Sequence, residues 1–138
     1  MDKALNYLAL ARKGGKAELG EEPVGGAARS GKAYLILAAS DCSDHTWRRA
    51  KSFAAGTEQQ CIRLPYSKNE LGMAIGRQEL ALAAITDAPL ALALVKALPA
   101  PEKYADALAA LTDKTQRLQK RQKEAQAHKK NVAKGRKK

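Results

Sequence analysis

The sequence predicts an α/β protein, a three-layer α/β/α sandwich around a mixed, mostly parallel central sheet, followed by a basic C-terminal helix or tail. Helix-like segments alternate with short apolar runs along most of the chain, and the connections between them are short. The 138 residues are 45% hydrophobic but only 4% aromatic. We therefore expect one compact domain with a core of leucine, alanine, isoleucine and valine.

Two helices separated by an extended segment are expected in the first 30 residues. Asp2 can cap a helix over residues 3–12, and Gly14 with Gly15 supplies its end. The extended piece KAEL follows. A second helix is expected to begin at residues 21–23, because two glutamates suit the positive end of a helix dipole and proline is tolerated in a first turn.

The middle of the chain predicts a central strand, a helix and a second strand. The run AYLILAAS, which begins at Ala33, is almost wholly apolar, as is typical of a strand buried on both faces. Either Ser43 or Asp44 can cap the helix that follows. A short strand is expected around residues 61–64.

A capping box marks the next helix. Ser67 and Glu70 have the S-x-x-E spacing of this motif, and the short helix that they start should end at Gly76. The run LALAAIT over residues 80–86 predicts another buried strand. Asp87 and the proline two residues later then start the helix LALALVKAL, and one further helix is expected after the prolines that close it.

Almost all of the excess positive charge lies at the C-terminal end. Residues 1–113 carry 14 Lys/Arg and 13 Asp/Glu, whereas residues 114–138 carry 11 Lys/Arg and a single acid, so the second segment holds +10 of the net +11. We expect a domain over residues 1–113 and a partly helical or disordered tail over residues 114–138, whose last residues have nothing to bury. A basic tail on a neutral domain indicates a polyanionic partner, nucleic acid first and an acidic membrane surface second.

Several other classes of protein are disfavoured. Two cysteines, Cys42 and Cys61, are too few for a disulfide scaffold, and neither a signal peptide nor an 18-residue apolar span is present, so a cytoplasmic protein is expected. Cys42 and His45 have C-x-x-H spacing, but only Cys61 and His128 remain to complete four zinc ligands. No P-loop or dinucleotide motif occurs. We expect no metal, no cofactor and no enzymatic activity.

Three motifs occur in an order that resembles a known family. They are LALARKGGKAELGEE, LILAASD and SKNELGMAIGR, the last followed by an apolar strand. Together they resemble the ribosomal L-seven-Ae superfamily over residues 3–98, and are most similar to its bacterial YlxQ-like branch. The resemblance implies an α/β/α domain that binds RNA, with kink-turn RNA as the superfamily's usual ligand and ribosome association in the branch.

The resemblance also implies an RNA-binding edge built from two segments. Carried over to this sequence, they are the start of the second helix at Gly20–Pro23 and the loop at Gly76–Glu79, with Gly20–Glu22 and Gly76–Gln78 as the expected RNA-binding edge. Gly76 would allow a left-handed helix end, and Arg77 would present a charge to phosphate. The full set of candidate RNA-binding residues is Lys13, Lys16, Gly20, Glu21, Glu22, Gly76, Arg77, Gln78, Lys114, Arg117, Lys120 and Arg121.

The first segment departs from the family pattern. The asparagine and glutamate of the family are Glu22 and Pro23 here, and a following lysine is Gly26. A glutamate lacks the amide donors of asparagine, and carboxylates repel phosphate. We therefore expect a standard kink-turn to be bound no better than a straight duplex, with RNA binding carried by the basic residues.

The expected partner is structured RNA, ribosomal RNA first, bound by a monomer that does not contact membranes. The alternative is a protein-interaction adaptor on the same fold, because Glu18, Glu21 and Glu22 could suit a basic partner. Trp47, the single tryptophan, is interpreted as a core or interface anchor rather than a base-stacking platform.

Overall fold

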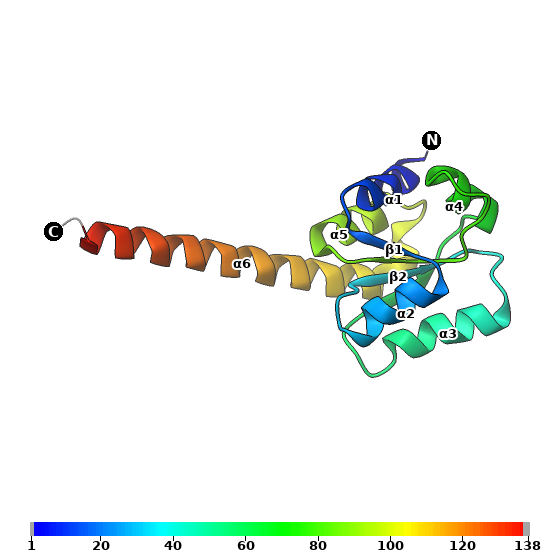
Figure 1. Ribbon diagram of the computed structural model, residues 1–138, viewed down its shortest axis with the longest axis horizontal. Coiled ribbons are helices and arrows are strands. Elements are labelled where there is room, and N and C mark those ends of the chain that lie inside the picture. The colour runs from blue at the N-terminus through cyan, green and yellow to red at the C-terminus, as the bar shows by residue number, and fades with distance from the viewer. Residues whose placement is uncertain (1, 137–138) are drawn as a thin grey trace.

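A computed structural model describes the backbone of residues 2–136 and the side chains of residues 2–128. Helices and strands alternate along the chain, as the sequence predicts (Figure 1). The elements are α1 (Lys3–Lys13), β1 (Ala17–Leu19), α2 (Glu21–Arg29), β2 (Leu35–Ala38), α3 (Asp44–Ala54), β3 (Gln60–Arg63), α4 (Lys68–Ala74), β4 (Leu82–Ile85), α5 (Ala88–Lys96), the 3-10 helix η1 (Pro101–Tyr104) and α6 (Ala105–Arg136).

The three-layer α/β/α architecture is confirmed. Helices α2 and α3 cover one face of the sheet, and α1, α5 and the first turns of α6 cover the other (Figure 1). All four residues of β2 and of β4 are buried, because these two strands lie in the middle of the sheet with a helical layer on each side. The nearly continuous apolar runs in the sequence come from this double burial.

The sheet is mixed, as predicted, but parallel pairs do not predominate. Its strand order is β1-β4-β2-β3, and β4 runs antiparallel to both β1 and β2, so that only β2 and β3 are parallel. The reason is the connection through α4. The chain leaves and re-enters the sheet at the same end, where the Ser40 amide bonds the Tyr66 carbonyl and the Leu80 amide bonds the Lys68 carbonyl. Therefore β4 starts at the end where β3 stops.

Side-chain caps start the helices where the sequence places them. Asp2 accepts a hydrogen bond from the Ala4 amide at 2.9 Å. Of the two residues that could cap α3, Ser43 is the N-cap. The predicted capping box is present, since the Glu70 amide donates to the Ser67 hydroxyl at 3.1 Å and the Ser67 amide donates to the Glu70 carboxylate at 3.0 Å. These local bonds explain why the helix starts were predictable.

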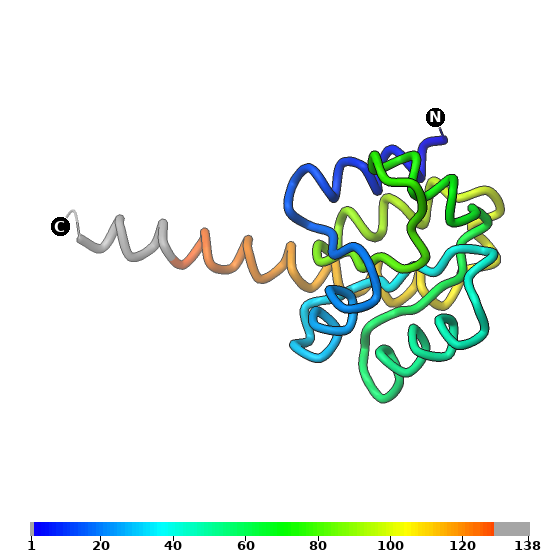
Figure 2. The backbone as a smooth tube through the Cα atoms, turned by 45° about the vertical axis from the view of Figure 1, so that its right-hand side comes forward, coloured from blue at the N-terminus to red at the C-terminus, as the bar shows by residue number. Residues whose placement is uncertain are grey.

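Helix α6 packs on the domain with its first turns and then projects away from it (Figures 1 and 2). The sequence predicts that docking ends near Leu111, but Thr115 is only 7% exposed and Leu118 is half-buried. From Gln119 to His128 every side chain is exposed. The predicted boundary between residues 113 and 114 thus falls inside one helix, and the division into domain and tail stays a prediction. Over the described residues, no helix has the length and hydropathy of a bilayer-spanning segment.

Candidate nucleic-acid interface

The two segments of the predicted edge lie at the same end of the sheet. The Gly20 amide donates to the carbonyl of Leu82 at 2.9 Å, and Leu82 is the first residue of β4, directly after the loop that contains Gly76–Gln78. Gly20 precedes α2 with a φ of 98°, a conformation that favours glycine. The fold therefore places at one end of the sheet the two segments that the family resemblance implies, although they are more than 50 residues apart in sequence.

The loop after α4 is held by its backbone and presents its side chains to solvent. Gly76 has a φ of 75°, and the Arg77 amide donates to the Gly72 carbonyl at 2.8 Å. A Cβ at Gly72 would lie 2.7 Å from the backbone of Glu79 and 2.8 Å from the Arg77 carbonyl. Gly72 is thus required by the close approach of this loop, rather than by helix packing. The side chains of residues 77–79 are exposed.

Acidic groups dominate the part of this edge contributed by α2. Glu22 is exposed, and Glu21 forms an ion pair with Arg49 of α3 at 3.0 Å. Glu79 is exposed two residues after Arg77. Carboxylates repel phosphate, and the two segments of this edge set one arginine, Arg77, against Glu21, Glu22 and Glu79.

The other end of the sheet is basic. Lys13 is the last residue of α1 and Lys16 lies in the turn before β1. The Lys16 carbonyl accepts a hydrogen bond from the Thr86 amide just after β4 ends. The predicted residues therefore divide between the two ends of the sheet instead of forming one site. Arg29, the last residue of α2, and Lys32, in the turn before β2, are exposed, and β2 starts at the same end. The sequence analysis missed these two residues, because a charge in a turn carries no signal of which end of the sheet it occupies.

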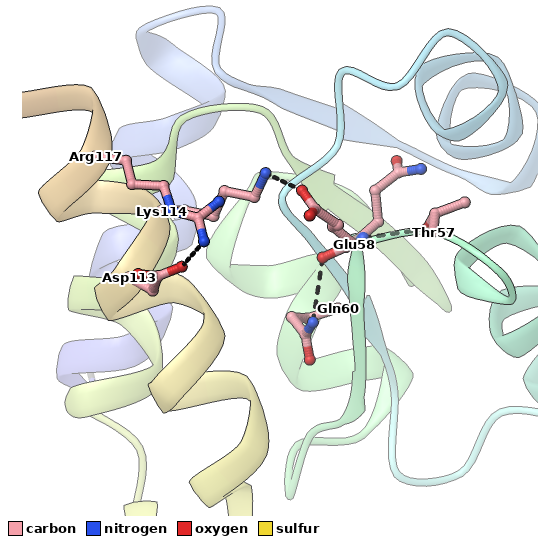
Figure 3. A network of polar contacts seen from close by, with 7 residues as sticks. Thr57, Glu58, Gln60, Asp113, Lys114 and Arg117 are labelled. Carbon is pink, nitrogen blue, oxygen red and sulfur yellow. Dashed lines mark hydrogen bonds and ion pairs between the residues drawn. The ribbon is translucent and has the colours of Figure 1, made fainter. Parts of the chain in front are cut away.

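Helix α6 passes beside this basic end as it leaves the domain (Figure 3). The ammonium group of Lys114 pairs with the carboxylate of Glu58, in the turn before β3, and lowers the pKa of that carboxyl. Arg117 pairs with Asp113 of its own helix at 2.8 Å. A hollow of about 330 Å³ separates Lys114 from Arg29. Lys114 is thus the predicted tail residue that links α6 to the domain, whereas Arg117 pairs within the helix.

We call the basic residues at this end of the sheet and on the adjoining part of α6 the basic end. It comprises Lys13, Lys16, Arg29, Lys32, Lys114, Arg117, Lys120 and Arg121. Three of these residues form ion pairs with acids. The Lys16 ammonium lies 3.4 Å from the Asp87 carboxylate, Lys114 pairs with Glu58, and Arg117 pairs with Asp113. Glu18 also lies at this end, in a hollow that it shares with Lys32. Lys120 and Arg121 are exposed on α6 beyond the domain.

Cys42 and Cys61 are free cysteines, Cys42 in the loop before α3 and Cys61 in β3. Cys42 is buried, and Arg63 Nη2 donates to its carbonyl at 3.3 Å and lies 3.6 Å from its Sγ. Burial raises the pKa of the Cys61 thiol to about 11. Within the described part of the chain, no group of three or more His, Cys, Asp or Glu residues is placed to hold an ion.

Comparison with known proteins identifies similar chains. The chain is 33% identical over 75 residues to an Enterococcus faecium protein named RNA-binding protein YlxQ, a match that covers 54% of this chain and 72% of that one. No protein-family model matches. A solved structure from Bacillus halodurans, of a protein of unknown function, matches with a TM-score of 0.65 and 26% identity over 70% of this chain and 96% of that one.

A second solved structure, the 15.5 kD RNA binding protein of Giardia lamblia, has the same fold. It matches with a TM-score of 0.56 over 67% of this chain and 82% of that one, at 20% identity. This likeness concerns the fold, whereas the identity to the Enterococcus protein concerns the sequence. These matches agree with the motif order and the strand arrangement. The chain belongs to the YlxQ-like branch of the ribosomal L-seven-Ae superfamily.

Proposed function

We propose that this protein binds structured RNA, with ribosomal RNA as the first candidate, and that it acts as a non-catalytic, ribosome-associated monomer in the cytoplasm. The observation that carries the proposal is the grouping of Lys16, Arg29 and Lys32 at the end of the sheet where α6 leaves the domain. Residues 114–138, most of which belong to α6, hold a net charge of +10. The Enterococcus relative is named an RNA-binding protein, which agrees with a polyanionic partner.

The basic end and α6 supply the affinity in this proposal. Lysine and arginine side chains that neutralise phosphates release condensed counterions, so binding weakens steeply with salt. Lys120 and Arg121 are exposed on a helix that stands clear of the domain, where an RNA backbone can reach them without any rearrangement of the fold. The turns before β1 and β2 extend this surface onto the domain.

The edge at Gly20–Glu22 and Gly76–Gln78 contributes positioning rather than affinity. Its exposed backbone at Gly76 allows close approach of a partner, and Arg77 can contact one phosphate. Glu22 repels a second phosphate strand. We therefore propose that a kink-turn has no advantage over other structured RNAs at this edge.

Charge removal at the basic end tests the proposal. Replacing Lys16 and Lys32 by glutamine should lower the affinity for a structured RNA hairpin about tenfold or more at moderate salt, since two phosphate contacts are lost. The matched control replaces Lys3 and Lys96, which are exposed elsewhere on the domain, and should change affinity little. Equal losses in both variants would show that net charge matters and the basic end does not.

A second candidate function is a protein-interaction adaptor that uses the acidic edge. The exposed Glu22 and Glu79 favour a basic protein partner there. The absorbance ratio of the purified protein separates the two candidates, because an RNA binder retains nucleic acid at low salt. RNA-free preparations together with no hairpin binding would favour the adaptor.

A further inference from the structure

A groove of about 510 Å³ runs along the outer edge of β3, and the proposed phosphate contacts do not use it. β3 is last in the strand order, so within residues 2–136 no strand pairs with its outer side. The side chains of Trp47 from α3 and Tyr104 from η1 line the groove, and β3 itself supplies Gln60–Arg63.

The main chain of β3 presents a specific pattern to this groove. The amides of Gln60 and Leu64 donate to carbonyls on the β2 side, at 3.1 Å and 2.8 Å. Since alternate residues of a strand direct their main-chain groups to opposite sides, those of Cys61 and Arg63 face the groove. The Arg63 carbonyl already accepts a hydrogen bond from the Tyr104 hydroxyl at 3.3 Å. The amide and carbonyl of Cys61 and the amide of Arg63 remain. Of these, the Cys61 carbonyl and the Arg63 amide form one acceptor beside one donor.

The amide and carbonyl of one residue in a neighbouring strand could form hydrogen bonds with this pair. The groove has no room for a longer strand beside β3. A strand added to β3 would continue past Arg63 and displace the Tyr104 hydroxyl from its carbonyl. A planar group with one donor next to one acceptor needs no such displacement. The base edges of single-stranded RNA offer that arrangement, and unstacked bases are the usual target of RNA recognition.

The two aromatic residues that line the groove, Trp47 and Tyr104, differ in whether their rings are free to stack on a base. The Arg63 guanidinium lies 5.1 Å and the Lys51 ammonium 5.5 Å from the ring centroid of Trp47, so this ring is engaged by cations of its own fold. The ring of Tyr104 is half-buried and held by its hydroxyl. Tyr104 is therefore the stacking surface, and Trp47 is a wall of the groove.

Charge at the groove also favours a base over a run of phosphates. Glu102 and Asp106 line it together with Lys103 and Arg63, so acids and bases are balanced. A balanced site does not attract a polyanion by itself, whereas carboxylates can accept hydrogen bonds from ribose hydroxyls. The occupant that fits these groups is a nucleoside unit rather than a backbone.

We propose that the groove at β3 binds one unpaired nucleobase of RNA, with its donor–acceptor edge on the Cys61 carbonyl and the Arg63 amide and its ring stacked on Tyr104. The proposal rests on the proposed RNA-binding function, because the RNA supplies the base. It adds a base contact to the phosphate contacts of α6, which begins one residue after Tyr104.

Nuclear magnetic resonance of the full chain tests this inference. Adenosine and uridine 5′-monophosphate are titrated into ¹⁵N-labelled protein, and the shifts of the Cys61 and Arg63 amides are followed with the indole signal of the single tryptophan, Trp47. We expect saturable shifts at these three signals. Tyr104→Ala should weaken nucleotide binding about fivefold or more, as for loss of one stacking surface, whereas Tyr104→Phe keeps the ring and should retain binding.

Two results would overturn the inference. One is the absence of saturable shifts at the β3 amides in the native chain, and the other is equal nucleotide affinity in the native chain and Tyr104→Ala. A response to a capped peptide of alternating threonine and valine, without one to nucleotides, would identify a strand-binding edge instead. Binding of the RNA hairpin is measured on the same samples. Hairpin binding without nucleotide-induced shifts would refute the base-binding role of the groove and leave the proposed function intact. Nucleotide-induced shifts without hairpin binding would refute the proposed function.

Discussion

Shortening α6 beyond its packed turns should separate the electrostatics of binding from the stability of the domain. The variant is truncated after Gln119 and lacks residues 120–138. Thr115 is 7% exposed and Leu118 half-buried, whereas the side chains from Gln119 to His128 are exposed, so this cut leaves the packed part of the helix in place. It removes nine Lys/Arg and one glutamate in residues 120–138, a net charge of +8.

The expected effect follows from counterion release. If about five of the removed charges meet phosphates of single-stranded RNA, at about 0.7 per contact, the slope of log affinity against log salt flattens by roughly 3.5 units. Between about 50 and 200 mM salt, a fourfold change, the native chain should then lose roughly 100-fold more affinity than the shortened one. The free energy of unfolding should be unchanged within about 0.5 kcal/mol, because the described side chains that the cut removes, from Lys120 to His128, are all exposed.

Fluorescence anisotropy of one labelled RNA across a salt series provides the measurement. Equal slopes for the two chains would refute the electrostatic role of α6. A cut after Asp113, at the boundary that the sequence predicts, is the comparison variant. It removes Thr115 and Leu118 from the packed surface and should lower the free energy of unfolding by roughly 1–2 kcal/mol through lost apolar burial.

Three further predictions concern the domain. Gly72→Ala should lower the free energy of unfolding by about 1–3 kcal/mol, because its Cβ would lie 2.7 Å from the Glu79 backbone, and denaturant unfolding measures this change. A standard kink-turn should bind within about tenfold of a matched straight duplex, since Glu22 lacks amide donors, as parallel titrations of the two RNAs would show. The rate of alkylation of Cys61 by iodoacetamide should rise about tenfold per pH unit until near its pKa of about 11. The thiolate is the reactive form, and burial raises the pKa of this thiol above its ordinary value.

Each of these has a control and a contrary outcome. Gly26→Ala is the matched variant for Gly72, because a Cβ at Gly26 meets no atom within 4 Å, and it should be neutral or slightly stabilising. A harmless Gly72→Ala would contradict the close approach of the loop. A kink-turn preference above about tenfold would mean that Glu22 does not exclude the family's contacts. Mass spectrometry locates the alkylated cysteine, and a rate that stops rising near pH 8 to 9 would contradict the raised pKa.

Much of this protein could be predicted from local sequence. The capping residues Asp2 and Ser67 with Glu70 set helix starts, because they bond backbone amides two or three residues away. The apolar runs within residues 33–40 and 80–86 indicated buried strands, and their burial is confirmed. The motif order also identified the family. For the helix starts, local pattern was enough because the capping bonds join residues two or three positions apart.

The tertiary structure decided the direction of β4 and the grouping of the charged residues. The sequence cannot show that α4 returns the chain to the end of the sheet that it left, and this return makes β4 antiparallel to β2. Packing also places Arg29 and Lys114, which are far apart in sequence, around one hollow. Lys16 and Gly20 lie at opposite ends of the short strand β1, so their charges and backbone serve different ends of the sheet. Periodicity determines which face of an element is buried. Which end of the sheet each turn occupies is determined by packing between distant segments.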